Sequence, residues 1–307
     1  MAMITVVGSL NMDLVINAPN IPKPGETILG RNFKQIPGGK GANQADAAAR
    51  LGGKVYMLGV VGQDAMGKIL KQSLEEDGVN VEHILEKDYL ATGVAAIIVD
   101  DQGNNAITVA PGANFELTSE DITKFQQVIL SSDLLLLQLE VPLDTVKTAL
   151  KLAKSAQKMT ILNPAPAVEL DREILSHTDI LTPNETELEQ LSGEKTDTLE
   201  NIQLAGKSLL DKGAKDIVVT LGEKGCMHIH KGGVKHYPAY KVKAVDTTAA
   251  GDSFNGALAV SLSQGKSMEE AIAFAMKIGA MTVTKEGAQT SLPWAKEIDL
   301  FEDWLKQ

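Results

Sequence analysis

Short runs of apolar residues recur along the chain and predict buried β-strands. They occupy Ile4–Val7, Val55–Val61, Leu134–Leu139, Thr160–Leu162, Ile180–Leu181 and Ile217–Thr220. Most of these runs are apolar throughout, without regular polar positions, which is typical of parallel strands covered on both faces. The pattern therefore predicts a mostly parallel sheet buried between two layers.

Helical patterns separate these runs. The candidate helices are Lys40–Leu51, Met66–Asp77, Leu143–Ala156, Leu199–Lys212, Asp252–Leu262 and Glu269–Thr284. Apolar residues recur within them at helical spacing, and Pro142 suits the first turn of the third helix. Strands that alternate with helices over short connections predict an α/β fold, with a parallel-rich central sheet flanked by helices.

Residues 13–36 and 91–110 break this alternation, because they hold short strands punctuated by Gly, Pro and Asn. In the second region Thr92–Val99 and Ala106–Val109 flank a turn at 101–104, which predicts an antiparallel hairpin. We expect both regions to form a small discontinuous β-sheet, a lid over the strand ends where ligands of α/β sheets bind. The predicted organisation is a single α/β domain over residues 1–307 that carries this lid.

Composition narrows the function classes. Of 307 residues, 44% are hydrophobic, and 29 Lys and Arg against 40 Asp and Glu leave a net charge of −11. That balance argues against a nucleic-acid-binding surface, and the lone Cys226 can form no internal disulfide. The start resembles no signal peptide, and no apolar run reaches the length of a membrane helix. We therefore expect a cytoplasmic protein that does not act at a membrane.

The segment GQDAMGKI at 62–69 nearly matches the phosphate-binding P-loop motif. Ile69 stands where that motif has a hydroxyl for magnesium, so we interpret the segment as a strand-to-helix turn. No GxGxxG pattern follows a strand, so the fingerprint of a dinucleotide site is also missing.

The segment VDTTAAGDSFNG at 245–256 carries the strongest chemical signal. Small residues at 249–251 allow close approach to the backbone, and a helix start attracts anions through its N–H groups and dipole. Asp252 could accept a hydroxyl proton there while the helix start holds a developing phosphate charge, as phosphoryl transfer requires. The alternative is that Asp252 merely caps a closely packed helix, and the residues alone favour neither.

A second segment, GGKGANQA at 38–45, places flexible backbone and the donors Lys40 and Asn43 at another predicted helix start. Hydrogen-bonding side chains also follow two predicted strands, namely Asn11, Asp13 and Glu140. Each alone is more often a cap or turn residue. Together they are typical of a site that recognises a polyhydroxyl ligand.

A third group of polar residues, NETE at 184–187 and TLGEKG at 220–225, follows two later strands. Carboxylates and amides beside glycine turns suit a nucleoside triphosphate whose magnesium is held through water. For Glu187 the alternative is a solvated first-turn acid favoured by the helix dipole.

These segments resemble the ribokinase/PfkB carbohydrate kinase family. The resemblance runs from GSLNMD at 8–13 to KEGAQTSLP at 285–293, which is nearly the whole chain, and its GAN and AAGD motifs are highly specific. It implies a Rossmann-like, ribokinase-type fold. Within the family, GSLNMD together with GGKGANQA is most similar to the members that act on D-ribose.

The resemblance implies transfer of the γ-phosphoryl group of ATP to the 5-hydroxyl of D-ribose, with Mg²⁺ and a monovalent activator, K⁺. Asp252 would be the catalytic base, and the amides of Ala249, Ala250, Gly251 and Asp252 would form the anion hole. The implied sugar contacts are Asn11, Asp13, Gly39, Lys40, Asn43, Glu140 and Asp252. The implied nucleotide contacts are Asn184, Glu187, Thr220, Gly222, Gly225 and Gly251.

For K⁺ the matching positions are Asp246, Thr248, Thr282, Lys285, Gly287 and Ser291, several of them acting through backbone carbonyls. The resemblance also implies a homodimer formed through the lids.

Several alternatives remain open at this point. A nucleoside kinase would need aromatic side chains around a base, and the chain is only 4% aromatic. A kinase for phosphorylated sugars would need further cationic groups, for which Lys40 and Arg31 are available. Deoxyribose or another pentose would differ from ribose by a single group. A non-catalytic sugar sensor or a nicotinamide-dependent oxidoreductase would keep the fold with different chemistry.

Overall fold

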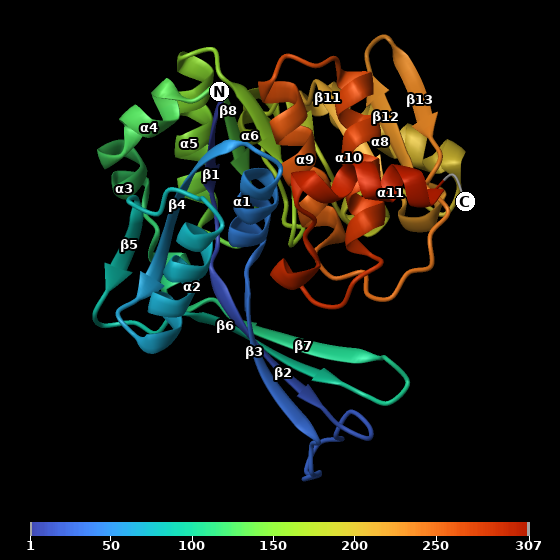
Figure 1. Ribbon diagram of the computed structural model, residues 1–307. Helices are drawn as coiled ribbons and strands as arrows, with labels where there is room; N and C mark the ends of the chain where they lie inside the picture. Colours follow the sequence, from blue (N-terminus) through green and yellow to red (C-terminus); the bar gives the residue numbers. More distant parts are fainter. Residues whose placement is uncertain (1, 306–307) are drawn as a thin grey trace.

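The computed structural model describes residues 2–305, which are built around a nine-stranded sheet in the order β13-β12-β11-β10-β9-β8-β1-β4-β5 (Figure 1). Its strands are β1 (Met3–Val7), β4 (Lys54–Gly62), β5 (Ile84–Lys87), β8 (Leu134–Leu137), β9 (Met159–Leu162), β10 (Ile180–Leu181), β11 (Asp216–Thr220), β12 (Cys226–His230) and β13 (Gly233–Tyr237). Neighbours from β5 to β11 are parallel, and β12 and β13 extend the sheet antiparallel. The predicted parallel-rich sheet is confirmed; Met1, Lys306 and Gln307 of the predicted domain lie outside the described residues.

Strand β8 shows why the central strands are apolar throughout. Its sequence is Leu-Leu-Leu-Leu, and all four side chains are buried. Leu134 and Leu136 belong to one hydrophobic cluster, whereas Leu135 and Leu137 belong to the other. Because successive side chains of a strand point to opposite faces, a strand covered on both sides needs apolar residues at every position.

Helices cover both faces of this sheet (Figure 1). One cluster contains residues of α1 (Lys40–Arg50), α2 (Ala65–Glu76), α9 (Ala250–Ser263) and α10 (Met268–Thr282), and α11 (Ile298–Leu305) packs beside it. The other contains residues of α3 (Ser119–Lys124), α4 (Gln126–Ser131), α5 (Leu143–Ser155), α6 (Arg172–His177), α7 (Glu185–Ser192) and α8 (Leu199–Lys212). Short 3₁₀ turns complete the fold at η1 (Gly112–Glu116), η2 (Gly222–Lys224), η3 (Gln289–Ser291) and η4 (Ala295–Glu297).

A four-stranded sheet in the order β3-β2-β6-β7 stands away from this body (Figure 1). Its strands are β2 (Asn11–Asn17), β3 (Asn32–Gly38), β6 (Gly93–Val99) and β7 (Asn105–Ala110). The two predicted antiparallel hairpins are present, as β2–β3 and β6–β7. They are joined by the pairing of β2 with β6, which is parallel, so the small sheet is mixed. Both strands lead outward from the main sheet, and they therefore run in the same direction.

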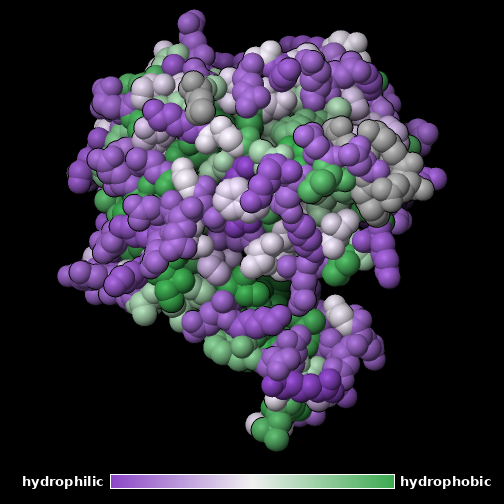
Figure 2. All heavy atoms as spheres, viewed as in Figure 1, coloured by the Kyte–Doolittle hydropathy of each residue, from purple (hydrophilic) through white to green (hydrophobic). Residues whose placement is uncertain are grey.

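Several large apolar side chains of the small sheet are exposed to solvent. Ile16 is 40% exposed, Phe33 58% and Ile107 55%. Figure 2 shows hydrophobic atoms on this projecting sheet among hydrophilic ones.

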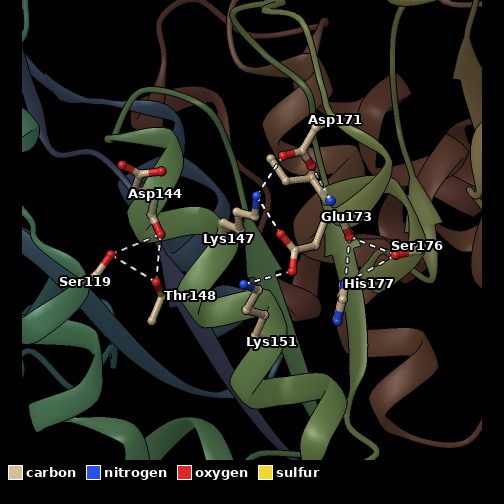
Figure 3. Close-up of polar contacts among 10 residues, drawn as sticks. Ser119, Asp144, Lys147, Thr148, Lys151, Asp171, Glu173, Ser176 and His177 are labelled. Carbon is tan, nitrogen blue, oxygen red and sulfur yellow. Dashed lines mark hydrogen bonds and ion pairs between the residues drawn. The ribbon is translucent and has the colours of Figure 1, made fainter.

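A network of ion pairs lies on the face of the main sheet opposite α1 and α9 (Figure 3). Lys147 of α5 contacts Asp171 at 2.7 Å and Glu173 at 2.5 Å, and Lys151 contacts Glu173 at 2.8 Å. These side chains are largely exposed, so water competes with each pair and the network contributes little to stability.

Candidate active site

Polar residues from distant parts of the chain meet where the parallel strands of the main sheet end. Asn11 follows β1, Glu140 follows β8 and Asn184 follows β10, while the N-termini of α1 and α9 point to the same edge. Because parallel strands present their carboxyl ends together, side chains far apart in sequence converge there.

Asp252 lies at the centre of this edge and is only 8% exposed. Helix α9 begins at Ala250, so Asp252 is its third residue, whereas the sequence predicted that Asp252 opens the helix. The N-cap is Ala249, and the capping alternative for Asp252 is therefore wrong. Its carboxylate instead accepts hydrogen bonds from Asn43 Nδ2 at 2.9 Å and Gln44 Nε2 at 3.0 Å.

The charge state of Asp252 reflects opposing effects. Burial is the largest effect and leaves the pKa of Asp252 raised, although the nearby ammonium of Lys40 and the amides of Asn43 and Gln44 act to lower it. A buried carboxyl group whose pKa is raised toward neutral pH can exchange a proton with a ligand hydroxyl.

The first turn of α9 presents backbone donors beside this carboxylate. Within residues 2–305, the N–H groups of Gly251 and Asp252 make no hydrogen bond, whereas Ser253 N donates to Ala249 O. Gly251 is exposed, and a Cβ placed on it would have no protein atom within 4 Å. Unpaired donors at the positive end of a helix dipole form a site for an anion such as a phosphoryl group.

Ala249 holds this turn in an unusual backbone conformation. Its φ of 58° lies in the left-handed region, which a residue with a Cβ rarely adopts. Such strain is common where a loop must aim backbone N–H groups at a ligand.

The predicted sugar contacts surround Asp252 on the side of the small sheet. Glu140 Oε2 accepts hydrogen bonds from Ser9 Oγ at 2.5 Å and Lys40 N at 3.1 Å, which ties the ends of β8 and β1 to the start of α1. Asn43 Oδ1 is buried and has no hydrogen-bond partner among the described residues, so its acceptor is available to a ligand hydroxyl.

Asp13 joins the same cluster from β2. Burial raises its pKa to about 7, and the negative charges of Glu140 and Asp252 act in the same direction, against the charge of Lys40. Asp13 therefore lies close enough to Glu140, Asp252 and Lys40 for their charges to act on its carboxyl group.

Close backbone packing requires the glycines of the GGKGANQA segment. Gly39 has a φ of 93°, and a Cβ on it would lie 2.6 Å from Asn11 N. A Cβ on Gly41 would lie 2.5 Å from Ser9 N. Because no side chain fits, α1 begins directly against the backbone that follows β1, and Lys40 and Asn43 are brought beside Asn11.

Sequence reasoning missed three residues that hold this cluster. Gln44 donates to Asp252, Ser9 donates to Glu140, and Asn114 Nδ2 donates to Asn11 Oδ1 at 2.8 Å. Gln44 and Ser9 lie inside the GGKGANQA and GSLNMD motifs, so their position in these motifs could have identified them. Asn114 is separated by 103 residues from Asn11, and nothing in the sequence connects them.

The predicted nucleotide residues lie at the ends of β10 and β11. Asn184 and Glu187 form a capping box at the start of α7, in which Asn184 Oδ1 accepts a hydrogen bond from Glu187 N at 2.8 Å. Asn184 also pairs with Thr220 through an isolated parallel β-bridge. Glu187 is not simply a solvated acid, because burial raises its pKa and the charges of Lys40 and Asp252 act on it. The charges of Lys40 and Asp252 therefore act both on Glu187, a predicted nucleotide residue, and on Asp13, a predicted sugar contact.

The TLGEKG turn packs against an apolar groove. A Cβ on Gly225 would lie 1.9 Å from Tyr237 O, so a glycine is required there. The groove has a volume of about 320 Å³ and is lined by Tyr237, Pro238, Ala239, Tyr240, Ala273 and Met276. A flat apolar group next to Gly222 and Gly225 would fit such a surface.

The predicted cation residues lie in two segments that contact each other. Asp246 Oδ2 accepts from Gly287 N at 2.9 Å and Oδ1 from Thr248 Oγ1 at 2.7 Å, which brings three of the positions together. The other three side chains are engaged elsewhere: Thr282 Oγ1 donates to Ile278 O, Lys285 pairs with Glu297 and Ser291 Oγ donates to Ala288 O. The side chains of these three positions therefore all have partners within the protein.

The near-P-loop segment forms a strand-to-helix turn, as interpreted from the sequence. Asp64 caps α2 by accepting from Gly67 N at 2.8 Å, and a Cβ on Gly67 would lie 2.3 Å from Gly62 O. The segment borders a hollow of about 910 Å³ whose lining includes none of the predicted site residues.

Two further features are absent from the part of the chain that the structure describes. None of its helices combines the length and apolarity needed to cross a membrane. Between residues 2 and 305 there is also no group of three or more His, Cys, Asp and Glu side chains arranged to hold a metal ion.

Comparison with known proteins identifies the class. The chain belongs to the pfkB family of carbohydrate kinases, whose family model matches residues 1–295. It is therefore a phosphotransferase that acts on a sugar hydroxyl.

Individual relatives cover nearly the whole chain. The ribokinase of Haemophilus influenzae is 43% identical over 294 residues, 96% of each chain. The deoxyribokinase of Salmonella typhi is 41% identical over 303 residues, 98% of each chain. Among solved structures, Arabidopsis thaliana ribokinase complexed with ribose and ATP superposes with a TM-score of 0.92 at 34% identity, covering 100% of both chains. The predicted ribokinase-type fold is thus confirmed.

Proposed function

We propose that the protein transfers the γ-phosphoryl group of ATP to the 5-hydroxyl of D-ribose, giving D-ribose 5-phosphate and ADP. One observation carries this proposal: the buried carboxylate of Asp252 lies in the same helical turn as the unpaired N–H groups of Gly251 and Asp252. A proton acceptor and an anion site at one helix start are the two elements that a phosphoryl transfer needs.

In this reaction Asp252 accepts the proton of the 5-hydroxyl as the oxygen attacks phosphorus. The N–H groups of the 249–252 turn bind the oxygens of the transferred group, where negative charge accumulates. Lys40, whose pKa is lowered by burial but raised by Asp252, Glu140 and Glu187, stays a cation and offsets the surrounding acids. Asn11, Asp13, Gly39, Asn43 and Glu140 bind the other sugar hydroxyls.

The nucleotide occupies the edge formed by Asn184, Glu187, Thr220, Gly222, Gly225 and Gly251. The apolar groove beside Gly225 receives the adenine ring. Glu187 suits a water-mediated contact to magnesium because its carboxylate is partly buried and faces the charges of Lys40 and Asp252. Mg²⁺ would supply neutralisation of the β- and γ-phosphate charge, as in phosphoryl transfer generally.

Potassium fits the junction of the 246–248 and 282–291 segments. Asp246 is well suited to stay ionised: although burial raises its pKa, hydrogen bonds from Thr248 and Gly287 hold it below its usual value. An ionised carboxylate among backbone carbonyls is a suitable oxygen environment for K⁺. The ion would stabilise the loop that precedes the anion hole.

The substrate choice rests on the relatives together with the site. Ribokinases among the sequence relatives and solved structures support ribose, and the deoxyribokinase makes 2-deoxyribose the main alternative. A nucleoside is disfavoured because the chain is only 4% aromatic, so few rings are available to stack on a base.

The small sheet, from about 13–36 and 91–110, acts as a lid on a single catalytic domain, since Asp13 of β2 reaches the cluster around Asp252. Its exposed apolar residues support homodimerisation through the lids. With ATP as co-substrate, the protein acts in the cytoplasm.

A coupled ADP-release assay tests this function across ribose, 2-deoxyribose, fructose, fructose 6-phosphate and adenosine, each with K⁺ or with choline as the monovalent cation. We expect the highest kcat/KM for ribose and a lower rate without K⁺. Preference for fructose 6-phosphate or adenosine would overturn the substrate assignment. A lack of ADP release with every sugar would refute the kinase activity and favour a non-catalytic sugar-binding protein. Indifference to K⁺ would overturn the cation site alone.

A further inference from the structure

A chain of buried amide side chains is hydrogen-bonded to Asp252. Its central member is Gln44, which is fully buried at 0% exposure. Gln44 Nε2 donates to Asp252 Oδ1 and to Asn163 Oδ1, both at 3.0 Å, and its Oε1 accepts from Gln138 Nε2 at 2.6 Å. Since Gln44 is inaccessible, it cannot bind the sugar itself.

The chain returns to the first turn of α9. Asn163 Nδ2 donates to Thr182 O at 3.1 Å, and Thr182 Oγ1 donates to Asn255 Oδ1 at 2.7 Å. Asn255 Nδ2 then donates to Gly251 O at 2.9 Å. The same network therefore holds both the carboxylate of Asp252 and the peptide that carries the anion-binding amides.

The hydrogen bonds allow only one orientation of the Gln44 amide. Its two N–H bonds go to a carboxylate and an amide oxygen, and its oxygen meets a donor, Gln138 Nε2. A reversed amide would set oxygen against oxygen at Asp252 and at Asn163, whose own amide is fixed by its bond to Thr182 O. Gln44 is thus a permanent donor to Asp252.

We propose that Gln44 is a positioning residue for the reaction, which fixes the direction of the Asp252 carboxylate and favours its ionised form without touching either substrate. This inference rests on the proposed function of Asp252 as the base. A donor to the ionised form favours it over the neutral acid, and burial acts in the opposite direction. Loss of the donor should therefore change the pH at which the base becomes active.

The first test replaces Gln44 by Met, which preserves volume and removes the hydrogen bonds. We expect kcat to fall about 10- to 100-fold because the carboxylate loses its fixed direction. We expect the acid limb of the kcat profile to move up by about one pH unit. The dissociation constant for ribose, measured by calorimetry, should stay within about threefold, because Gln44 is inaccessible.

The second test, Gln44→Glu, keeps the shape and replaces the donor by an acid. At pH 8 two ionised carboxylates would face each other at the 3.0 Å contact, and their repulsion should displace Asp252, so activity should be lost. At pH 6 the introduced carboxyl group is expected to be protonated and to donate to Asp252 again, so this variant should regain activity relative to the parent as pH falls. Gln44→Met should show no such recovery.

A matched control is Thr5→Val, since Thr5, in the middle of β1, is also 0% exposed and hydrogen-bonded, to Ser132. This substitution should lower the melting temperature, and the pH profile of kcat should stay the same as that of the parent. If Gln44→Met and Gln44→Glu keep the parent's kcat and acid limb, the inference is wrong. A parent protein that phosphorylates no sugar would instead refute the proposed function, so the two failures are distinguishable.

Discussion

Asn43 Nδ2 donates a 2.9 Å hydrogen bond to Oδ2 of Asp252, joining residues that are 209 positions apart in the chain. Asn43 belongs to the first turn of α1 and Asp252 to the first turn of α9. Both helix starts therefore face one point, and the buried acid is aligned by the helix that carries the proposed sugar contacts.

Asp252→Asn should lower kcat by about 10³-fold or more, because the amide cannot accept the hydroxyl proton. Ribose binding, measured by calorimetry, should survive, since an amide keeps the shape and an acceptor. Asp144→Asn on the exposed surface of α5 is the control and should behave as the parent. Turnover close to that of the parent in Asp252→Asn would show that another group takes the proton.

Gly251→Ala should separate function from stability. A Cβ there meets no protein atom within 4 Å, so the helix should be unchanged or more stable by about 0.5–1 kcal/mol. The methyl group would occupy the space in front of the unpaired amides, and kcat should fall about tenfold or more. Gly279→Ala in α10, whose Cβ would lie 3.7 Å from Ala250 O, should raise stability without this loss. Equal activity in both variants would place the phosphate elsewhere.

Asp13→Asn should change how stability depends on pH. The folded-state pKa is about 7 against an ordinary value of 3.8, so the folded protein binds the extra proton between these values. Stability should therefore fall as pH rises from about 4 to 7 and level off above 7. Asn carries no charge and removes this dependence, so the variant should be more stable than the parent at pH 8, by about 1–3 kcal/mol.

The same substitution should weaken ribose binding at pH 8, because the ionised acceptor is lost. Urea unfolding and ribose titrations at pH 5 and pH 8 check both effects. A parent protein whose stability is flat over that range contradicts the assigned charge state of Asp13.

Arg50→Met should be strongly destabilising. The Arg50 side chain is only 11% exposed and contacts Asp46 at 2.8 Å and Asp77 at 2.7 Å, and it also donates to Gln289 O at 2.8 Å. Its loss leaves two acids without their cation and releases the segment around Gln289, which belongs to the proposed cation site, at a cost of about 3 kcal/mol. Lys147→Met, which removes the exposed pairs shown in Figure 3, is the control and should leave the urea midpoint unchanged. Similar midpoints for both variants would contradict the structural role of Arg50.

Asp246→Asn should weaken activation by K⁺, because the site loses its ionised carboxylate. The Asn oxygen can accept from Thr248 or from Gly287, but not from both. We expect the K⁺ concentration for half-maximal activity to rise about tenfold, with choline-supported activity unchanged. Thr290→Val, in the same exposed loop, serves as the control. An unchanged K⁺ response in Asp246→Asn would exclude this residue from the site.

The central strands of the main sheet could be predicted because each carries its own signal, whereas the short edge strand β5 was missed. The run Leu134–Leu137 needs apolar residues on both faces, and the period of α1 and α10 distinguishes helix from strand. Motifs with unusual backbone demands were equally visible, as Gly39 shows by its positive φ beside Asn11. These requirements involve only neighbouring residues, so they can be predicted from a short stretch of sequence.

Pairings between distant segments could not be predicted in this way. The parallel join of β2 and β6, the contact of Asn114 with Asn11 and the engagement of Lys285 with Glu297 depend on where the chain returns. The start of α9 at Ala250 was missed for a related reason: Ala249 adopts a left-handed conformation that its side chain disfavours, and the surrounding structure imposes it.

By itself, the sequence determined the central strands, six of the helices, the family motifs and the residues that carry the proposed chemistry, because each depends on a short stretch of chain. Only the tertiary structure decided how these residues act together. It turned Asp252 inward onto Asn43 and Gln44, left the N–H groups of Gly251 and Asp252 unpaired and set Asp13 among other acids. Burial, charge and hydrogen-bond direction at a site depend on neighbours hundreds of residues away, and these neighbours are set only when the sheet assembles.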